Sequence, residues 1–389
     1  MSDSPNVLLD CGKPLFFQVA DDISPIKVPE VRLGDAVRLH VRSLSAMQKE
    51  AIVASSNSDV IWRLSSDEGA YLNGFDAAPC PLSFLTTGMV ASYMNEILAL
   101  AKQRGINIKN IRLIQDNYYT MKGSALRGTM IGGAKNIDLE AQIDSDVDKE
   151  TLTGLVYDAV TAIPLNGLMQ GEKESLFMLN HNGNDIALGK AKSVGVVLGA
   201  VKITDMEKLE ANGGNQLIRK AGLSPKTSDT NSSHGSSLAD EQDRLLHIRG
   251  ICTLRDDGVK QIEQQLYNPH GSIFHFLSDE NGRAPNAISY ISAGIGFCYM
   301  TQLGRYAKIS KKNLDSYTVI QDTHFSKGGA SGGTGIPGAA DPVETHVYIE
   351  SEHDDDYART VLDMGEQTCF LHAFCRTDLK AKIKISNYE

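Results

Sequence analysis

The feature that most constrains this chain is an internal repeat, because its second half copies the first at a shift of 206 residues (284 minus 78). Residues 78–94 read APCPLSFLTTGMVASYM, and residues 284–300 read APNAISYISAGIGFCYM. The same shift relates the Ile-Gln-Asp triplets at 114–116 and 320–322. A repeat of this length is a whole domain and not a unit of a solenoid. The sequence therefore predicts two copies of one fold.

Cysteines break the symmetry of the repeat. At this shift Cys298 stands opposite Ser92, and Cys369 stands opposite Ile163. Thiols at these positions in only one copy predict one working site and one supporting site. Six cysteines in 389 residues do not make a disulfide framework, so we expect a reducing cytoplasmic environment with redox-active or nucleophilic thiols. We interpret three others as structural: Cys11, Cys80 and Cys252.

Composition and charge exclude several classes of protein. The formal net charge is −10 and no run of Lys or Arg occurs, which argues against nucleic-acid binding. No stretch reaches the roughly 20 apolar residues that span a bilayer. The first residues lack a basic segment followed by an apolar run, so we expect no secretory signal. The length is that of two or three domains.

The domain boundaries follow from the repeat and from composition. Residues 1–222 are expected to form copy one, with 1–45 as an N-terminal extension, and residues 245–389 to form copy two. Between them, residues 223–244 contain the polar run SPKTSDTNSSHGSS, which is typical of a flexible linker.

Each copy is expected to combine strands with one long helix, at residues 82–104 and 286–305. Both helices are apolar and rich in small residues, so we expect them to contact each other at the centre of the protein. Residues 47–55 are expected to form a short helix. The Gly-rich stretch 326–342 lacks the Lys-Ser/Thr ending of a phosphate-binding loop, so we interpret it as a hairpin loop.

Residues that can carry chemistry gather in copy two. Cys298 lies in the apolar run ISYISAGIGFCYMTQLGRY, where a cysteine can simply pack as a small hydrophobe. The presence of Cys369 in the same copy favours a functional pair. Histidines near a thiol can serve as a base for nucleophilic catalysis or can bind a metal, but no CxxC or HxxxH spacing supports a metal site. The candidates in copy two are His270, His275, His324 and His372.

The order of these features resembles the OsmC/Ohr family. That family has strands, a long helix carrying the first Cys after an Ala-Gly-rich run (SAGIGFC here), more strands, and a second Cys before the last strand (CFLHAFCRTDLKAKIKI here). The resemblance covers about Val53–Leu179 and Ile248–Ile385. It implies an α+β fold of two tandem OsmC-like domains, each with antiparallel strands around a long central helix. It also implies that they pack as an intramolecular pseudo-dimer with the site at their boundary.

The resemblance further implies reduction of organic hydroperoxides without a cofactor or metal, in which Cys298 attacks the peroxide and Cys369 resolves the sulfenic acid. A dithiol is the implied reductant, and Cys375 is an alternative resolving thiol. The family's Glu, ten residues before the first Cys, is absent, because Ile288 stands there. A thiolate still needs a nearby positive charge. The candidates are Arg255 first, then Arg305 and Arg63.

Two other functions remain open from the residues. Cys298 with His324 or His372 can form a nucleophile–base pair that acts on a small apolar or aromatic electrophile. Alternatively, the cleft between the copies holds an apolar ligand without catalysis. In every case copy one is expected to act as scaffold, with Arg63 or Tyr118 reaching into the site.

Overall fold

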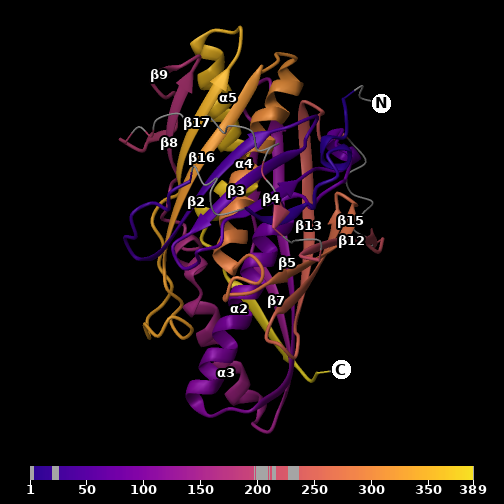
Figure 1. The fold of residues 1–389 in the computed structure, drawn as a ribbon, viewed down its shortest axis with the longest axis vertical. Helices are drawn as coiled ribbons and strands as arrows, with labels where there is room; N and C mark the ends of the chain where they lie inside the picture. The colour runs from indigo at the N-terminus through magenta and orange to yellow at the C-terminus, as the bar shows by residue number, and fades with distance from the viewer. Residues whose placement is uncertain are drawn as a thin grey trace.

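The molecule is built from two β-sheets with two long helices between them (Figure 1). The helix of the first half, α2 (Pro81–Arg104), packs against one sheet, and the helix of the second half, α4 (Ala287–Ser310), packs against the other. Most of the apolar core lies between these layers. The computed structural model describes residues 4–19, 26–196, 198, 209, 211–212, 216–226 and 236–388.

The larger sheet mixes strands from both halves. Its strands are β1 (Phe16–Val19), β2 (Gly34–Ser43), β3 (Lys49–Ser55), β4 (Trp62–Ser66), β8 (Leu176–His181), β9 (Asn184–Ile186), β10 (Lys192–Ser193), β11 (Ala211–Asn212), β16 (Ser316–Ser326) and β17 (Glu344–Glu350). Their order is β10-β8-β17-β16-β2-β3-β4-β1-β11, with β9 beside β8. The halves join where β16 pairs antiparallel with β2 and where β8 pairs parallel with β17.

The smaller sheet repeats this arrangement with the halves exchanged. Its strands are β5 (Ile108–Ser124), β6 (Ile131–Ala134), β7 (Ile137–Ser145), β12 (Ile218–Leu223), β13 (Glu241–Leu254), β14 (Lys260–Asn268), β15 (Ser272–Ser278) and β18 (Ala381–Ser386). Their order is β12-β15-β14-β13-β5-β7-β18, with β6 beside β5. Here β13 pairs antiparallel with β5, and β18 pairs parallel with β7. Each sheet therefore needs both halves.

The helices begin and end at residues suited to those positions. Pro81 opens α2, and Gly105 ends it at a φ of 67° that favours glycine. The side chain of Asn286 caps α4 by accepting from the Ser289 N–H at 2.9 Å. The remaining helices are α1 (Val7–Asp10), η2 (Ala70–Leu72), α3 (Lys149–Ala162), η3 (Pro164–Leu168), α5 (Asp355–Thr368) and α6 (Phe370–Cys375).

Two glycines at equivalent positions of the repeat let the long helices cross closely. A Cβ added to Gly294 would lie 2.7 Å from the backbone nitrogen of Leu85, and one added to Gly88 would lie 2.5 Å from the carbonyl oxygen of Ala287. Any side chain at either position would collide with backbone. The expected contact between the long helices is confirmed, and so is the α+β pseudo-dimer.

One local expectation was wrong, and one boundary stays a prediction. Residues 47–55 do not form a helix, because 49–55 make strand β3, which is buried along its whole length. Of the expected linker, residues 227–235 lie outside the described residues, while 241–244 already belong to β13.

Within the described ranges, every helix is too short or too polar to cross a membrane.

Candidate thiol site

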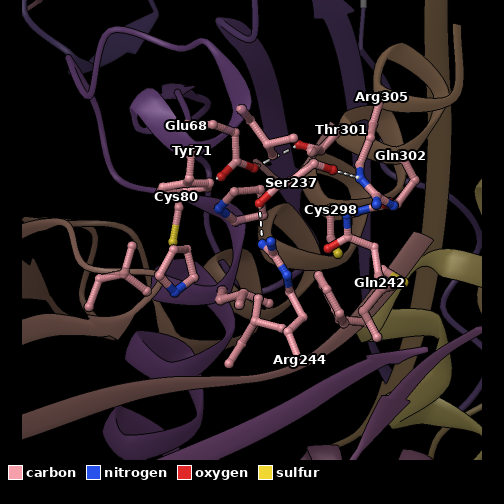
Figure 2. A pocket seen from close by; sticks show the side chains of 18 residues that line it. Glu68, Tyr71, Cys80, Ser237, Gln242, Arg244, Cys298, Thr301, Gln302 and Arg305 are labelled. Atoms are coloured by element: carbon pink, nitrogen blue, oxygen red, sulfur yellow. Dashed lines mark hydrogen bonds between the residues drawn. The ribbon is translucent and has the colours of Figure 1, made fainter. Parts of the chain in front are cut away.

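The middle of α4 carries Cys298 at a cavity between the two halves (Figure 2). Its exposed fraction is 2%, so the thiol meets the cavity and not the outer surface. The cavity walls are largely apolar. First-half residues in the wall are Tyr71, Leu72, Leu82 and Met121, and second-half residues are Leu246, Leu266, Pro269 and Phe370.

A loop that differs in length between the copies builds part of this wall. Thirteen positions separate Glu68 from Pro81 at the start of α2, but only seven separate Glu280 from Ala287 at the start of α4. The longer loop contains η2, whose Tyr71 lines the thiol cavity. Copy one therefore shapes the site although it lacks both thiols.

The two expected thiols meet at the first turn of α6. Cys369 is the N-cap of this helix, and its sulfur accepts from the His372 N–H at 3.5 Å. The side chains of Cys298 and Cys369 lie within hydrogen-bonding range of each other. Both cysteines are reduced, and Cys369 is fully buried. Cys298 faces the cavity, whereas Cys369 lies behind it.

The two thiols differ in acidity. Burial raises the pKa of Cys298 well above its usual range, and donation to Cys369 raises it further. Burial also opposes ionisation of Cys369, but the S–H of Cys298 and the neighbouring His372 hold the pKa of Cys369 below its usual range.

A buried ion pair from the first half lies beside the thiol cavity, because Glu68 is part of the cavity wall. Glu68 accepts from the Thr301 hydroxyl at 3.0 Å and from the Tyr71 hydroxyl at 2.6 Å. Its carboxylate lies 4.0 Å from the Lys49 ammonium, and both side chains are buried. Burial lowers the pKa of Lys49, and the charge of Glu68 opposes this shift. The Lys49 ammonium also donates to the Met47 carbonyl oxygen at 2.7 Å.

The sequence contains a signal for this pair that the single shift of 206 conceals. Ser-Asp-Glu at 66–68 recurs at 278–280, a shift of 212. Glu280 lies 3.9 Å from Lys260, so the second copy repeats the ion pair. The longer loop of copy one therefore changes the shift between the copies, which is 212 residues before the loop and 206 residues after it.

The arginine expected first is not at the site. Arg255 lies at the exposed β13–β14 turn and pairs with Asp257 at 2.9 Å, so its proposed contact with the thiol was wrong. Arg63 pairs with Glu50 at 2.6 Å beside Phe17, away from the cavity. Arg305 does line the cavity.

The two expected histidines have different locations. His372 is buried on α6 beside Cys369, with its ring edge-on to Tyr299 at 5.1 Å between centroids. His324 is not near the thiols. On β16, Thr323 faces α4 and hydrogen-bonds Ser292 at 2.6 Å, so the neighbouring His324 points to the opposite face of the sheet. That expectation was wrong.

Other expected residues also lie apart from the thiol pair. Tyr118 stacks on His247 at 4.6 Å between centroids, on the side of its sheet away from the cavity. Cys375 is buried at the end of α6. Cys80 also lines the cavity, and burial raises its pKa to about 12.

The position equivalent to the thiol site holds a different cavity around Ser92. It has a volume of about 370 Å³, and its walls include the charged side chains of Asp35, Glu280 and Lys327. One turn after Ser92, the buried Glu96 accepts the N–H groups of Ala330 at 2.8 Å and Ser331 at 3.1 Å. A phosphate bound by the Gly-rich loop would need these backbone N–H groups, but the Glu96 carboxylate already accepts from them.

Among the residues that the structure describes, no three His, Cys, Asp or Glu side chains lie close enough to hold a metal ion.

Comparison with known proteins gives a family for the second half. Residues 279–384 match the family model described as OsmC-like protein. This segment runs from the end of β15 into β18 and contains both thiols. The resemblance inferred from the sequence is confirmed over this range.

Part of the chain is similar to solved structures, among them an OsmC-like hydroperoxide resistance protein from Jannaschia sp. CCS1, with 20% identity and a TM-score of 0.26. The match covers 40% of this chain and 99% of that one. A search of curated proteins finds no match.

Proposed function

Because the second half carries an OsmC-like domain with both thiols in contact, we propose that this protein reduces organic hydroperoxides, with Cys298 as the attacking thiol and Cys369 as the resolving thiol. The observation that carries the proposal is the position of Cys298. It reaches an apolar cavity, and its partner thiol sits directly behind it. This arrangement suits an apolar substrate and a disulfide product.

In the first step the Cys298 thiol passes its proton to the Cys369 thiolate, and the Cys298 sulfur attacks the terminal oxygen of the hydroperoxide. The O–O bond breaks, Cys298 becomes a sulfenic acid, and the departing alkoxide takes the proton back from Cys369 to leave as an alcohol.

The second step closes the thiol cycle. The Cys369 thiolate attacks the Cys298 sulfur, a disulfide forms, and the hydroxide that leaves is protonated to water. A dithiol reductant then restores both thiols and is itself oxidised to a disulfide. The net reaction converts one hydroperoxide and one dithiol into an alcohol, water and a disulfide.

Intact mass spectrometry after addition of cumene hydroperoxide tests the proposal. A Cys298–Cys369 disulfide supports it, whereas an unchanged mass favours a binding protein. A covalent adduct from a non-peroxide electrophile favours the Cys–His nucleophile, for which His372 is the available histidine.

Variants separate the roles of the thiols. Cys298→Ser should abolish turnover, and Cys369→Ser should complete one turnover and stop at a sulfenic acid. Cys375→Ser is the matched control, because it removes a buried thiol from the same short helix. Full steady-state activity of Cys369→Ser would remove it as the resolving residue.

A further inference from the structure

The cavity around Ser92 has the same origin as the thiol cavity, because their walls correspond residue by residue. At the shift of 206 residues, four wall positions of the Ser92 cavity stand opposite four of the thiol cavity: Ile288 opposite Leu82, Ser92 opposite Cys298, Asn95 opposite Thr301, and Glu96 opposite Gln302. The Ser92 cavity has room for a small ligand, with a volume of about 370 Å³. The duplication therefore produced two cavities, and only one of them holds the thiol pair.

Sheet pairing gives the Ser92 cavity a carboxylate that replaces an apolar side chain of the thiol cavity. Asp35 on β2 pairs with Phe325. Leu246 on β13 pairs with Tyr119, which stands opposite Phe325 in the repeat. Asp35 thus occupies the place that Leu246 has in the thiol cavity. Because alternate residues of a strand share a face, Asp35 lies on the same face of the sheet as the core residue Val37.

Asp35 and Ser92 are buried polar groups with little to bind them. Their exposed fractions are 8% and 3%. The Ser56 hydroxyl donates to the Asp35 carboxylate at 3.5 Å, and no cation of the described residues forms an ion pair with it. Burial raises the pKa of Asp35, and the charge of Lys327 opposes this shift from a longer distance. The Ser92 hydroxyl, at the wall of the cavity, forms no hydrogen bond with the described part of the chain. Both groups are therefore free to bind a ligand.

The other charged side chains of the wall favour a cation in the cavity. Glu280 and Glu96 are two further carboxylates, and Lys327 is the one cation among the wall residues that the structure describes. Glu280 lies 3.9 Å from Lys260, and Glu96 is bound by N–H groups of the Gly-rich loop. Three negative charges against one positive charge attract a cation and repel an anion. The acceptor left over for that cation is Asp35.

A primary ammonium group suits these acceptors best. It carries three N–H donors around a compact charge, whereas the donors of a guanidinium lie in one plane. One donor can bind the Asp35 carboxylate while another binds the Ser92 hydroxyl oxygen. Pro164 and Ile288 in the same wall provide apolar surface for the carbon chain of an amine.

We propose that the Ser92 cavity binds a small organic cation through a primary ammonium group, which Asp35 and Ser92 hold. This site is separate from the reduction proposed at Cys298. Its test therefore measures binding and not turnover, and Cys298→Ser should bind the ligand as the wild type does.

Ligand-observed NMR tests the proposal with n-butylamine, which is protonated at neutral pH, and with 1-butanol, its uncharged analogue. We expect the wild type to bind the amine at least roughly 10-fold more tightly than the alcohol. Asp35→Asn keeps the shape of the side chain and should weaken amine binding by roughly 10- to 100-fold, the range of a charged hydrogen bond. Ser92→Ala should weaken it by roughly 3- to 10-fold. Asp257→Asn, which removes an exposed carboxylate at the β13–β14 turn, is the control and should leave the affinity unchanged.

Several results would overturn the proposal. Absence of amine binding to the wild type removes the site, and equal binding of amine and alcohol removes the recognition of charge. Displacement of the amine by an equal concentration of potassium ions would identify a site for any cation. An unchanged affinity in Asp35→Asn would place the amine elsewhere. If Asp35→Asn fails to fold, Ser92→Ala takes its place, and an affinity equal to that of the wild type overturns the site.

Discussion

Replacing Gly294 by alanine tests whether the helix crossing sets the geometry of the thiol site. The added Cβ would lie 2.7 Å from the Leu85 nitrogen and 3.2 Å from its Cα, both backbone atoms of α2. Because backbone cannot rotate away, the helices must separate, and overpacking of this kind costs roughly 2–3 kcal/mol. Alanine regains about 1 kcal/mol of helix propensity. We expect a net loss of roughly 1–2 kcal/mol of unfolding free energy.

Urea unfolding measures this loss, followed by the fluorescence of the single tryptophan, Trp62, which is buried in β4. The urea concentration at the midpoint of unfolding should fall, and the dependence of the unfolding free energy on urea concentration should stay the same. Gly154→Ala in α3 is the matched control, because nothing lies within 4 Å of its added Cβ. It should gain up to about 1 kcal/mol. If Gly294→Ala is as stable as Gly154→Ala, the close crossing is not what requires glycine.

The same substitution has a functional consequence. Cys298 follows Gly294 by one helical turn, so a shift of α4 away from α2 should move the thiol relative to Glu68 and Cys369. Alkylation of Cys298 by iodoacetamide should change in rate in Gly294→Ala and stay constant in Gly154→Ala. Unchanged alkylation in both variants would contradict this link.

Three further predictions follow from the described contacts. Ser92→Ala should leave turnover nearly unchanged, and a large loss with the fold intact would defeat the model of one working site. Glu96→Ala should cost about 1–3 kcal/mol for each N–H of the Gly-rich loop left without an acceptor, and hydrogen exchange at Ala330 should accelerate. Burial lowers the pKa of His40 from 6.5 to about 4, so His40 destabilises the fold as the pH falls below 6.5. The free energy of unfolding should therefore be about 2 kcal/mol smaller at pH 5 than at pH 7. His40→Phe should remove this difference. An equal pH dependence in both proteins would assign the effect to other groups.

The long helices were predictable because their sequences are apolar all round and interrupted by small residues. A helix that is apolar on every side has to be buried, and its small residues allow another helix to pack closely against it. Strand β3 was not predicted, because its sequence does not show that it is buried. Its first residues, Lys49 and Glu50, are typical of an exposed helix, yet both are buried because Glu68 and Arg63 pair with them. Pairing partners that are distant in sequence cannot be read from a local window.

The site was predicted as far as its thiols and no further. Cys298 and Cys369 could be found because each breaks the repeat at a fixed shift. Glu68 could not, because it lies upstream of the loop that changes the shift from 206 to 212. The cation was sought among three arginines, Arg255, Arg305 and Arg63, and only Arg305 lines the cavity.

Fusion of the two copies explains why one site can differ so much from the other. In a dimer of identical chains, any change to a loop or a wall appears in both sites. In this chain the longer loop, with Tyr71 in its short helix, lines the thiol cavity, while the cavity at Ser92 is lined by other residues, among them Asp35 and Lys327. Arg305 also lines the thiol cavity, and the matching position of the first copy is Ala99. This charged side chain is therefore present in only one of the two copies. Both sheets still require strands from both halves, so the copy without thiols cannot be lost while the fold is kept.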